Sequence, residues 1–255
     1  MLLRCDTSIA DSYTSGAQKS RVLSEHWLES NGYCLSCDSS VLRRARANMR
    51  ATDFLCPTCD QSYELKAFKV LPKRSLVDGA YSALMGRILD GSAPTLMMLE
   101  RSEHWEIRSL TAIHHLFLTP EVIEKRKPLS DTARRAGWIG CKIRLDRIAP
   151  DAKISIIASG RPNDPETVRG SFKRFENLNK VSPAKRGWTN LTLGIVQSLQ
   201  AHSFTLKDLY DREDDFATVY PTNKNIRPKI RQQLQVLRDL GYLIFLGNGA
   251  YRALI

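Results

Sequence analysis

The sequence lacks any apolar run that approaches the roughly 20 residues of a membrane-spanning helix. Its beginning, MLLRCDTSIADSY, has too few consecutive apolar residues for a secretory signal peptide. We therefore expect a cytoplasmic protein with no membrane partner. Acidic residues are also scarce, because 27 Asp and Glu stand against 38 Lys and Arg, which gives a formal net charge of +11. This excess favours a polyanionic partner, nucleic acid before an acidic membrane, although a merely soluble basic surface has the same composition.

Cysteine is infrequent, with six in 255 residues. In a reducing cytosol such residues point to metal binding or inert packing and not to disulfides. Four of them follow the spacing C-x2-C-x18-C-x2-C, namely Cys34, Cys37, Cys56 and Cys59. Each short pair offers two thiolates to one ion and two pairs complete a tetrahedron, so the pattern predicts a closed, structural zinc site. Cys5 and Cys141 stand apart and are expected to be buried or neutral.

Two short strands are predicted around the second cysteine pair, at Ala51–Leu55 and Tyr63–Val70. This places Cys56 and Cys59 in the turn of a hairpin. Asp53 lies on the first strand and Glu64 on the second, so their carboxylates should lie close together.

This acidic pair predicts a site for a divalent cation. Magnesium needs few protein ligands because it keeps several waters, so the carboxylates of Asp53 and Glu64 suffice, with the backbone carbonyl of Leu65 as a third ligand. Lys66 projects on the same face of its strand as Glu64, because side chains alternate. It would stand beside the ion and help to orient or deprotonate an attacking water during phosphodiester hydrolysis.

The Asp…Glu-x-Lys layout is similar to the PD-(D/E)xK nuclease core, with Thr52 in place of the proline that precedes the aspartate. Alone, an E-x-K triplet on a surface strand is more often a solvated charge pair. Its position in a strand–turn–strand unit, its basic flank and a DNA-binding C-terminal region favour the nuclease interpretation.

Residues 1–180 are predicted to form an α/β domain, because helical and extended segments are mixed along them. Helices are expected at Ser15–Glu29, Leu76–Leu89 and Pro165–Leu178, and further strands at Thr95–Leu99, Trp105–Ile107, Ile113–Leu118 and Lys153–Ala158. Residues 125–140 are too rich in Pro, Gly and charge for a regular element and are expected to form an ordered surface loop. Residues 181–188 have the composition of a linker.

Residues 189–255 follow the order of a winged helix-turn-helix domain. Three helices and a closing hairpin are expected at Thr189–Leu199, Thr205–Tyr210, Ile226–Leu240, Leu243–Leu246 and Ala250–Leu254. The polar side of the third helix suits base edges in the major groove, since Asn and Gln pair with adenine and Arg with guanine. Its candidate DNA-binding residues are Lys224, Asn225, Arg231, Gln232 and Gln235. The alternative is an exposed polar helix that contacts nothing.

Two longer stretches carry a resemblance to one family. Residues 127–141, KPLSDTARRAGWIGC, and residues 229–239, KIRQQLQVLRD, resemble the DpnI-type methyl-directed Type II restriction endonucleases, and the likeness runs over almost the whole chain. It implies an enzyme that cuts double-stranded DNA at GATC only when the adenine is N6-methylated, with both domains reading that sequence. It also implies that Asp53, Glu64 and Lys66 form the active site.

The resemblance further implies that Trp138 forms part of a methyladenine pocket. The physical chemistry agrees, because a methyl group on adenine N6 adds apolar surface that an exposed ring between glycines can contact. Without the family, a tryptophan folded into the core would be the preferred interpretation. Arg134 and Arg135 are candidate phosphate contacts.

We therefore expect an α/β protein with a PD-(D/E)xK restriction-endonuclease-like domain, an embedded zinc site and a C-terminal winged helix-turn-helix domain. The expected activity is magnesium-dependent cleavage of GATC that contains N6-methyladenine, by a protein that is a monomer in solution. The rival hypothesis is a non-cleaving, sequence-specific reader of methylated DNA that acts as a regulator.

Overall fold

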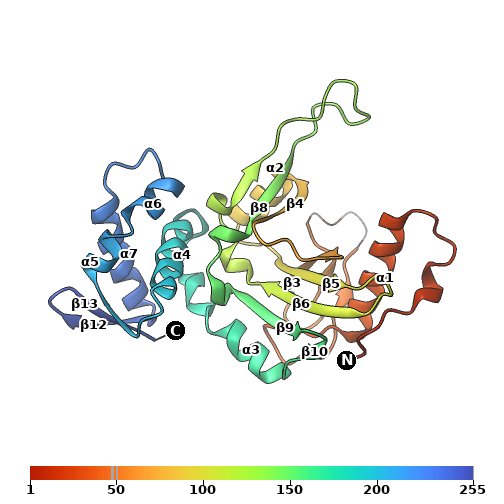
Figure 1. The fold of residues 1–255 in the computed structure, drawn as a ribbon, viewed down its shortest axis with the longest axis horizontal. Coiled ribbons are helices and arrows are strands. Elements are labelled where there is room, and N and C mark those ends of the chain that lie inside the picture. The colour runs from red at the N-terminus through yellow and green to blue at the C-terminus, as the bar shows by residue number, and fades with distance from the viewer. Residues whose placement is uncertain (47–48, 50, 255) are drawn as a thin grey trace.

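The chain has a larger N-terminal part built on a curled sheet and a smaller, mainly helical C-terminal part beside it (Figure 1). The computed structural model describes residues 1–46, 49 and 51–254. Within these residues, no helix combines the length and apolar character needed to cross a membrane.

The main sheet has seven strands, of which only the central pair β3 and β5 is parallel. In spatial order the strands are β1 (Arg43–Arg44), β2 (Phe54–Leu55), β3 (Ser62–Phe68), β5 (Thr95–Arg101), β6 (Ile107–Ile113), β9 (Lys153–Ala158) and β10 (Arg161–Pro162).

The sheet separates two apolar cores. Successive side chains of a strand point to opposite faces, and on β5 Leu96 and Met98 enter one core while Met97 and Leu99 enter the other. Helices α1 (Gly16–Asn31) and α3 (Pro165–Lys173) contribute buried residues to the core that contains Met97. A second sheet and the C-terminal part cover the face that carries Leu96.

The second sheet consists of three antiparallel strands in the order β4, β8, β7. Their bounds are β4 (Ser75–Ala80), β7 (Ile123–Lys125) and β8 (Gly140–Arg144). Residues 126–139 connect β7 to β8 and project far from the body of the molecule (Figure 1). They form the irregular loop that their composition predicts.

The helix predicted at Leu76–Leu89 is wrong in its first half, because the chain forms β4 there and the helix α2 spans only Tyr81–Leu89. Along β4, Leu76 and Asp78 are buried while Val77 is exposed, which is the alternation of a strand. The backbone groups of β4 pair with β8, a partner more than 60 residues away. Local spacing contains no information about that partner.

The strand predicted at Ile113–Leu118 is also wrong. Ile113 ends β6, and His115–Phe117 form a 3-10 turn (η2) that begins where the His114 side chain accepts a hydrogen bond from the Leu116 amide at 3.2 Å. The strand predicted at Trp105–Ile107 is wrong at its start, because Trp105 lies in the turn before β6 with φ of 62° and β6 begins at Ile107.

The helix predicted at Pro165–Leu178 is too long, because α3 ends at Lys173. The other short 3-10 turns are η1 (Thr7–Ala10), η3 (Pro120–Val122), η4 (Leu145–Arg147), η5 (Pro150–Ala152) and η6 (Glu176–Lys180).

The C-terminal part has the winged helix-turn-helix order that the sequence predicts, with one additional short strand and one additional helix, α6. Its elements are α4 (Pro183–Ser198), β11 (Ser203–Thr205), α5 (Leu206–Tyr210), α6 (Glu213–Val219), α7 (Ile226–Asp239), β12 (Leu243–Gly247) and β13 (Ala250–Ala253). The predicted linker is largely helical, because α4 begins at Pro183. Proline suits the first position of a helix, where its missing N–H leaves no bond unmade.

The two parts share one continuous core. Leu193 of α4 and Leu234 of α7 belong to the same buried cluster as Leu96 of the main sheet. Polar contacts cross the same boundary: the Asn190 side-chain amide donates to the Leu116 carbonyl at 2.8 Å, and that of Asn177 donates to the Leu240 carbonyl at 3.0 Å.

Candidate active site, zinc site and DNA-reading surfaces

The orientation of β3 decides which residues can do chemistry. Tyr63 and Leu65 point into the core beneath α1 and α3. By alternation, Glu64 and Lys66 point to the opposite face, toward the second sheet. The sequence prediction that these two side chains share a face agrees with the structure.

Asp53 reaches the edge of β3 from the neighbouring strand. Its backbone N–H donates to the Tyr63 carbonyl at 2.9 Å, and its carboxylate Oδ2 accepts the Leu65 N–H at 2.8 Å. Because β2 starts only at Phe54, this carboxylate occupies the position where the hairpin ladder stops. The hairpin thereby brings Asp53 next to Glu64.

Asp78 is a residue of this cluster that sequence reasoning missed. The Lys66 ammonium lies 2.7 Å from Glu64 Oε1 and 2.5 Å from Asp78 Oδ1. Asp78 comes from β4, and its side chain is 2% exposed. A single acid between apolar residues, in LVDGAY, was the available signal, but the segment was predicted as a helix.

The carboxylates of Glu64 and Asp53 lie in surroundings that disfavour their negative charge. Burial raises the pKa of Glu64 to about 7, against the opposing effect of Lys66, and the negative charges of Asp78 and Asp53 add to the rise. Burial also raises the pKa of Asp53, although the Leu65 N–H and Lys66 act in the other direction. A divalent cation would relieve both, and two carboxylates form a donor set that suits a hard cation with retained water.

The acidic neighbours of Lys66 favour its charged form. Burial alone would lower the pKa of Lys66, but the adjacent carboxylates of Glu64 and Asp78 outweigh this and raise the pKa. A lysine in this state can donate hydrogen bonds and stabilise negative charge. It is a poor proton acceptor near neutral pH, so orientation of a water fits it better than deprotonation.

The four predicted cysteines converge on one point. The ligand atoms of Cys34, Cys37, Cys56 and Cys59 all lie within 4.8 Å of one another. Among the described residues, this is the one group of three or more His, Cys, Asp or Glu side chains close enough together to hold a metal ion. Two Sγ–Sγ distances, Cys34–Cys59 and Cys37–Cys56, are 3.5 Å. A tetrahedron with Zn–S bonds of ~2.3 Å has edges of about 3.8 Å, so the cluster could hold a structural zinc ion.

Backbone amides prepare this cluster for thiolates. The N–H groups of Ser36 and Thr58 each lie 3.4 Å from a sulfur, of Cys34 and Cys56 respectively. For Cys56, burial opposes ionisation, but the N–H groups of Thr58 and Cys59 and the neighbouring thiols outweigh it and lower the pKa to about 6. Burial and the neighbouring sulfurs raise the pKa of Cys59. Opposite shifts are expected where like charges meet without a cation.

The zinc site and the active-site hairpin share their supports. The Tyr63 hydroxyl, on β3 directly before Glu64, accepts the Leu35 N–H at 2.9 Å and lies 3.2 Å from the Cys34 sulfur. Arg169 of α3 donates to the Cys34 carbonyl at 3.1 Å.

On the other side of the hairpin, the Arg87 guanidinium from α2 donates to the Ser62 hydroxyl at 3.0 Å and contacts the Thr52 hydroxyl. Thr52 and Ser62 are direct neighbours of Asp53 and Tyr63. The hairpin that carries the acids is thus held at its tip by the cysteines and at its base by α2.

Trp138 lies at the base of the 126–139 loop. Its ring covers Gly140, where a Cβ would come within 2.9 Å of the ring carbons. The Arg135 guanidinium lies 5.0 Å from the ring centre, and Arg134 and Arg135 are both exposed. The ring is half-buried and belongs to neither main core, so the alternative of a core tryptophan does not describe it.

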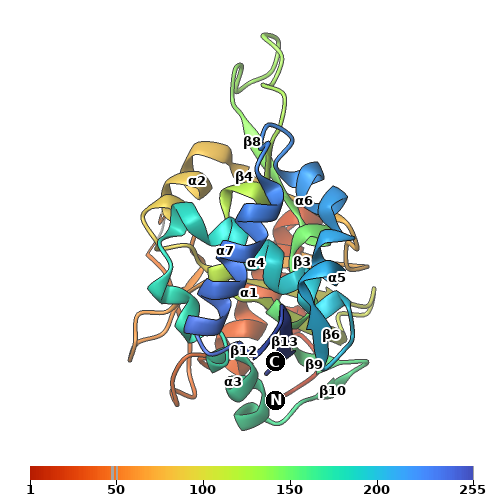
Figure 2. The same ribbon diagram turned by 90° about the vertical axis from the view of Figure 1, so that its left-hand side faces the viewer.

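Helix α7 has one buried and one exposed side, as its spacing predicts. Ile226, Ile230, Leu234 and Leu237 are buried, whereas the five candidate DNA-binding residues Lys224, Asn225, Arg231, Gln232 and Gln235 are exposed. Arg231 donates to the Tyr210 hydroxyl at 2.7 Å. The loop before α7 and the 126–139 loop extend toward the same side of the molecule in both views (Figures 1 and 2). The candidate active site, the 126–139 loop and the exposed side of α7 belong to one folded body. Their residues do not form a single cluster.

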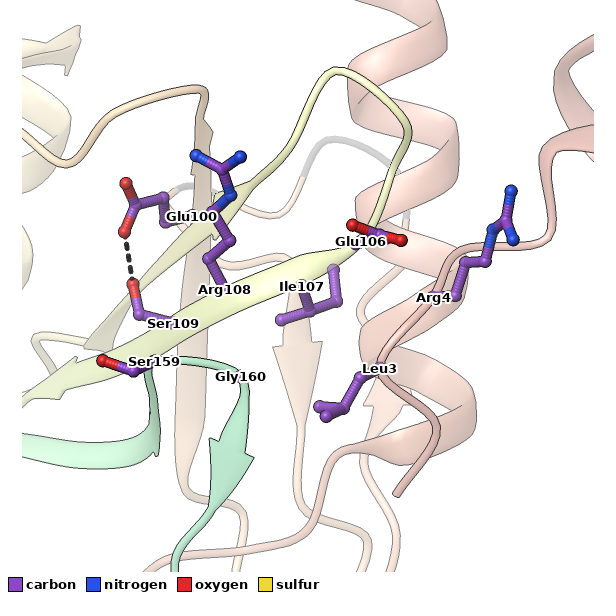
Figure 3. A pocket seen from close by; sticks show the side chains of 9 residues that line it. All are labelled: Leu3, Arg4, Glu100, Glu106, Ile107, Arg108, Ser109, Ser159 and Gly160. Atoms are coloured by element: carbon purple, nitrogen blue, oxygen red, sulfur yellow. Dashed lines mark hydrogen bonds between the residues drawn. The ribbon is translucent and has the colours of Figure 1, made fainter.

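A surface hollow lies apart from these residues. It has a volume of about 750 Å³ and lies where β5, β6 and the β9–β10 turn meet, with Arg4, Arg108 and Glu106 on its walls (Figure 3). Glu100 on its rim is already bonded to the Ser109 hydroxyl at 2.8 Å. None of the predicted site residues lines this hollow. A polymer binds along an extended surface, so the hollow does not mark the candidate site.

Two family models match the chain. One, described as DpnI, Dam-replacing family, covers residues 1–181. The other, described as the Dam-replacing HTH domain, covers residues 184–253.

Proposed function

The chain belongs to the Dam-replacing (DpnI) family, and from this premise we propose that it is a methylation-dependent restriction endonuclease that cuts double-stranded DNA at GATC containing N6-methyladenine. The observation that carries the proposal is the convergence of Asp53, Glu64 and Lys66 on one hairpin. A helix-turn-helix domain in the same chain supplies a surface for duplex DNA.

The proposed chemistry is hydrolysis by in-line attack of water on phosphorus. Asp53 and Glu64 would hold a magnesium ion together with the Leu65 carbonyl, and the ion, when bound, would neutralise charge on the phosphate and lower the pKa of water. Lys66, kept protonated by its two acidic neighbours, would orient the attacking water and stabilise the charge that develops on the phosphate oxygens.

Recognition is proposed to be divided between the two parts. In the nuclease part, Trp138 would contact the N6-methyl group while Arg134 and Arg135 hold the backbone. In the winged part, α7 would enter the major groove with the exposed residues Lys224, Asn225, Arg231, Gln232 and Gln235. The four cysteines would hold a structural zinc ion that fixes the hairpin.

We assign residues 1–180 to the nuclease part and residues 189–255 to the winged part. The start of α4 at Pro183 supports a boundary in residues 181–188, of which residues 183–188 already belong to that helix. We expect the protein to be a monomer in solution.

The test compares plasmids in which every GATC adenine is methylated or unmethylated, incubated with purified protein and magnesium. Cleavage of the methylated plasmid alone is the expected result. Folded protein that binds methylated DNA but leaves it intact would contradict the nuclease proposal and favour the non-cleaving reader.

Lys66→Ala provides the residue-level test of the same proposal. We expect the cleavage rate to fall by at least 10²-fold, about the size of the loss of one charge-stabilising group, with DNA affinity retained. Glu103→Gln is a matched control, because it removes the acid from another lysine pair, the exposed Lys69–Glu103 contact at 2.9 Å. Unchanged cleavage by Lys66→Ala would remove Lys66 from the mechanism.

A further inference from the structure

We propose that Asp78 is the positioning residue for the catalytic lysine: it anchors the Lys66 ammonium from the second sheet and holds it in place when Glu64 serves a metal ion. This inference rests on the proposed nuclease function and assigns a role to a residue outside the Asp…Glu-x-Lys pattern.

The first argument is the cost of burying Asp78. Its side chain is 2% exposed, and within the described residues Lys66 is its one ion-pair partner, at 2.5 Å. A buried carboxylate without a nearby cation is strongly disfavoured, and breaking a buried pair costs more than the pair contributes. The fold therefore holds this acid beside Lys66, its one ion-pair partner in the described part of the chain.

The second argument concerns competition for Glu64. In the structure, Glu64 Oε1 and Asp78 Oδ1 both contact the Lys66 ammonium. Glu64 is a proposed metal ligand. A carboxylate that coordinates a divalent ion attracts the lysine ammonium less strongly. Asp78 lies on a different strand and a different sheet, so it can hold Lys66 whatever Glu64 binds.

The third argument is the place of Asp78 in the second sheet. Asp78 pairs with Cys141 on β8, and the register shifts between Asp78 and Ala80, which faces Gly140. A Cβ on Gly140 would lie 3.5 Å from the Asp78 carbonyl and within 2.9 Å of the Trp138 ring. The strand pair that carries Asp78 thus also packs, at Gly140, against the ring proposed to contact the methylated base.

The first measurement needs no variant at position 78. In 15N-lysine-labelled protein without magnesium, a lysine ammonium held by two carboxylates exchanges its protons slowly and should give a resolved 1H–15N signal. The signal is assigned by its loss in Lys66→Ala. Absence of a protected Lys66 signal in the wild-type protein would overturn the proposal.

The second measurement separates positioning from folding. Asp78→Asn keeps the size of the side chain but removes its charge, and we expect kcat on methylated DNA to fall on the order of 10²-fold, the effect of misplacing a reacting group, with KM and DNA affinity unchanged. The Lys66 ammonium signal should broaden or disappear. In a Lys66→Ala background the same substitution should change cleavage no further. Glu103→Gln, which removes a surface partner of a lysine, should leave both kcat and the Lys66 signal unchanged.

Three results would count against the role of Asp78. They are an unchanged kcat in Asp78→Asn, a loss confined to DNA affinity, and an additive loss in the double variant. If Asp78→Asn does not fold, the wild-type signal decides the proposal. If the wild-type protein cuts no methylated DNA, the proposed function fails, whereas the ammonium measurement still tests the anchor.

Discussion

Individual residues of the proposed active site differ in how far the sequence reveals them. The proximity of Asp53, Glu64 and Lys66 could be predicted because their spacing within one hairpin is itself the pattern. Asp78 could not, because its partner Lys66 lies across a junction between two sheets. The contact depends on β4 pairing with β8, which only the folded chain shows.

Trp138 gives the sharpest prediction at this scale. In Trp138→Ala the preference for methylated over unmethylated GATC should fall at least about fourfold, which corresponds to the ~0.8 kcal/mol of one buried methyl group. Trp138→Phe, which keeps an aromatic face, should retain part of the preference. The measurement is the ratio of cleavage rates on matched duplexes.

The Trp138 prediction has a clear contrary outcome. A Trp138→Ala protein that cuts both duplexes more slowly by the same factor would place the ring in general DNA binding and not in selection of the methyl group. Thermal melting of each variant controls for loss of the fold, because the ring also packs on Gly140.

Local chemistry predicts some elements correctly. Cysteines at fixed spacing predict the hairpin between β2 and β3, although β2 covers only Phe54–Leu55 of the expected Ala51–Leu55 strand, and the apolar run Lys153–Ala158 predicts β9 with its observed bounds. Local spacing fails where distant partners stabilise an element: it predicts a helix where β4 forms and no helix where α6 forms. Its segment, Glu213–Val219, shows one fully buried residue, Phe216, which is too little for a periodic pattern.

Loss of zinc should disable the active site through the hairpin. In Cys56→Ser we expect bound zinc to fall well below one ion per chain and cleavage to be lost even with excess magnesium, because the turn that joins β2 to β3 is no longer fixed. Zinc analysis and plasmid cleavage measure the two effects. Cys5→Ala is the control, since Cys5 is a buried thiol outside the quartet and both properties should persist. Full cleavage by zinc-free protein would contradict the hairpin argument.

One of the two apolar cores of the molecule spans the boundary between its two parts. The sequence indicates two domains by a change in pattern, and residues 181–188 have the composition of a linker. In the structure α4 begins there, and its buried apolar residues belong to the same cluster as Leu96 of the main sheet. The composition of residues 181–188 does not reveal the burial of α4, because that burial depends on the surface against which the helix packs. The winged part is therefore expected to hold a fixed orientation relative to the nuclease part.

A shared core predicts that both parts unfold together. Leu193 of α4 is fully buried in that core, so Leu193→Ala should lower the free energy of unfolding by about 2–5 kcal/mol. Calorimetry should show one transition, shifted as a whole to lower temperature, in place of a loss confined to the winged part. Ile244→Ala on the exposed side of β12, where the residue is 42% exposed, should shift it little. Two separate transitions, with only one displaced by Leu193→Ala, would show that the parts fold independently and that their relative orientation must be set by DNA.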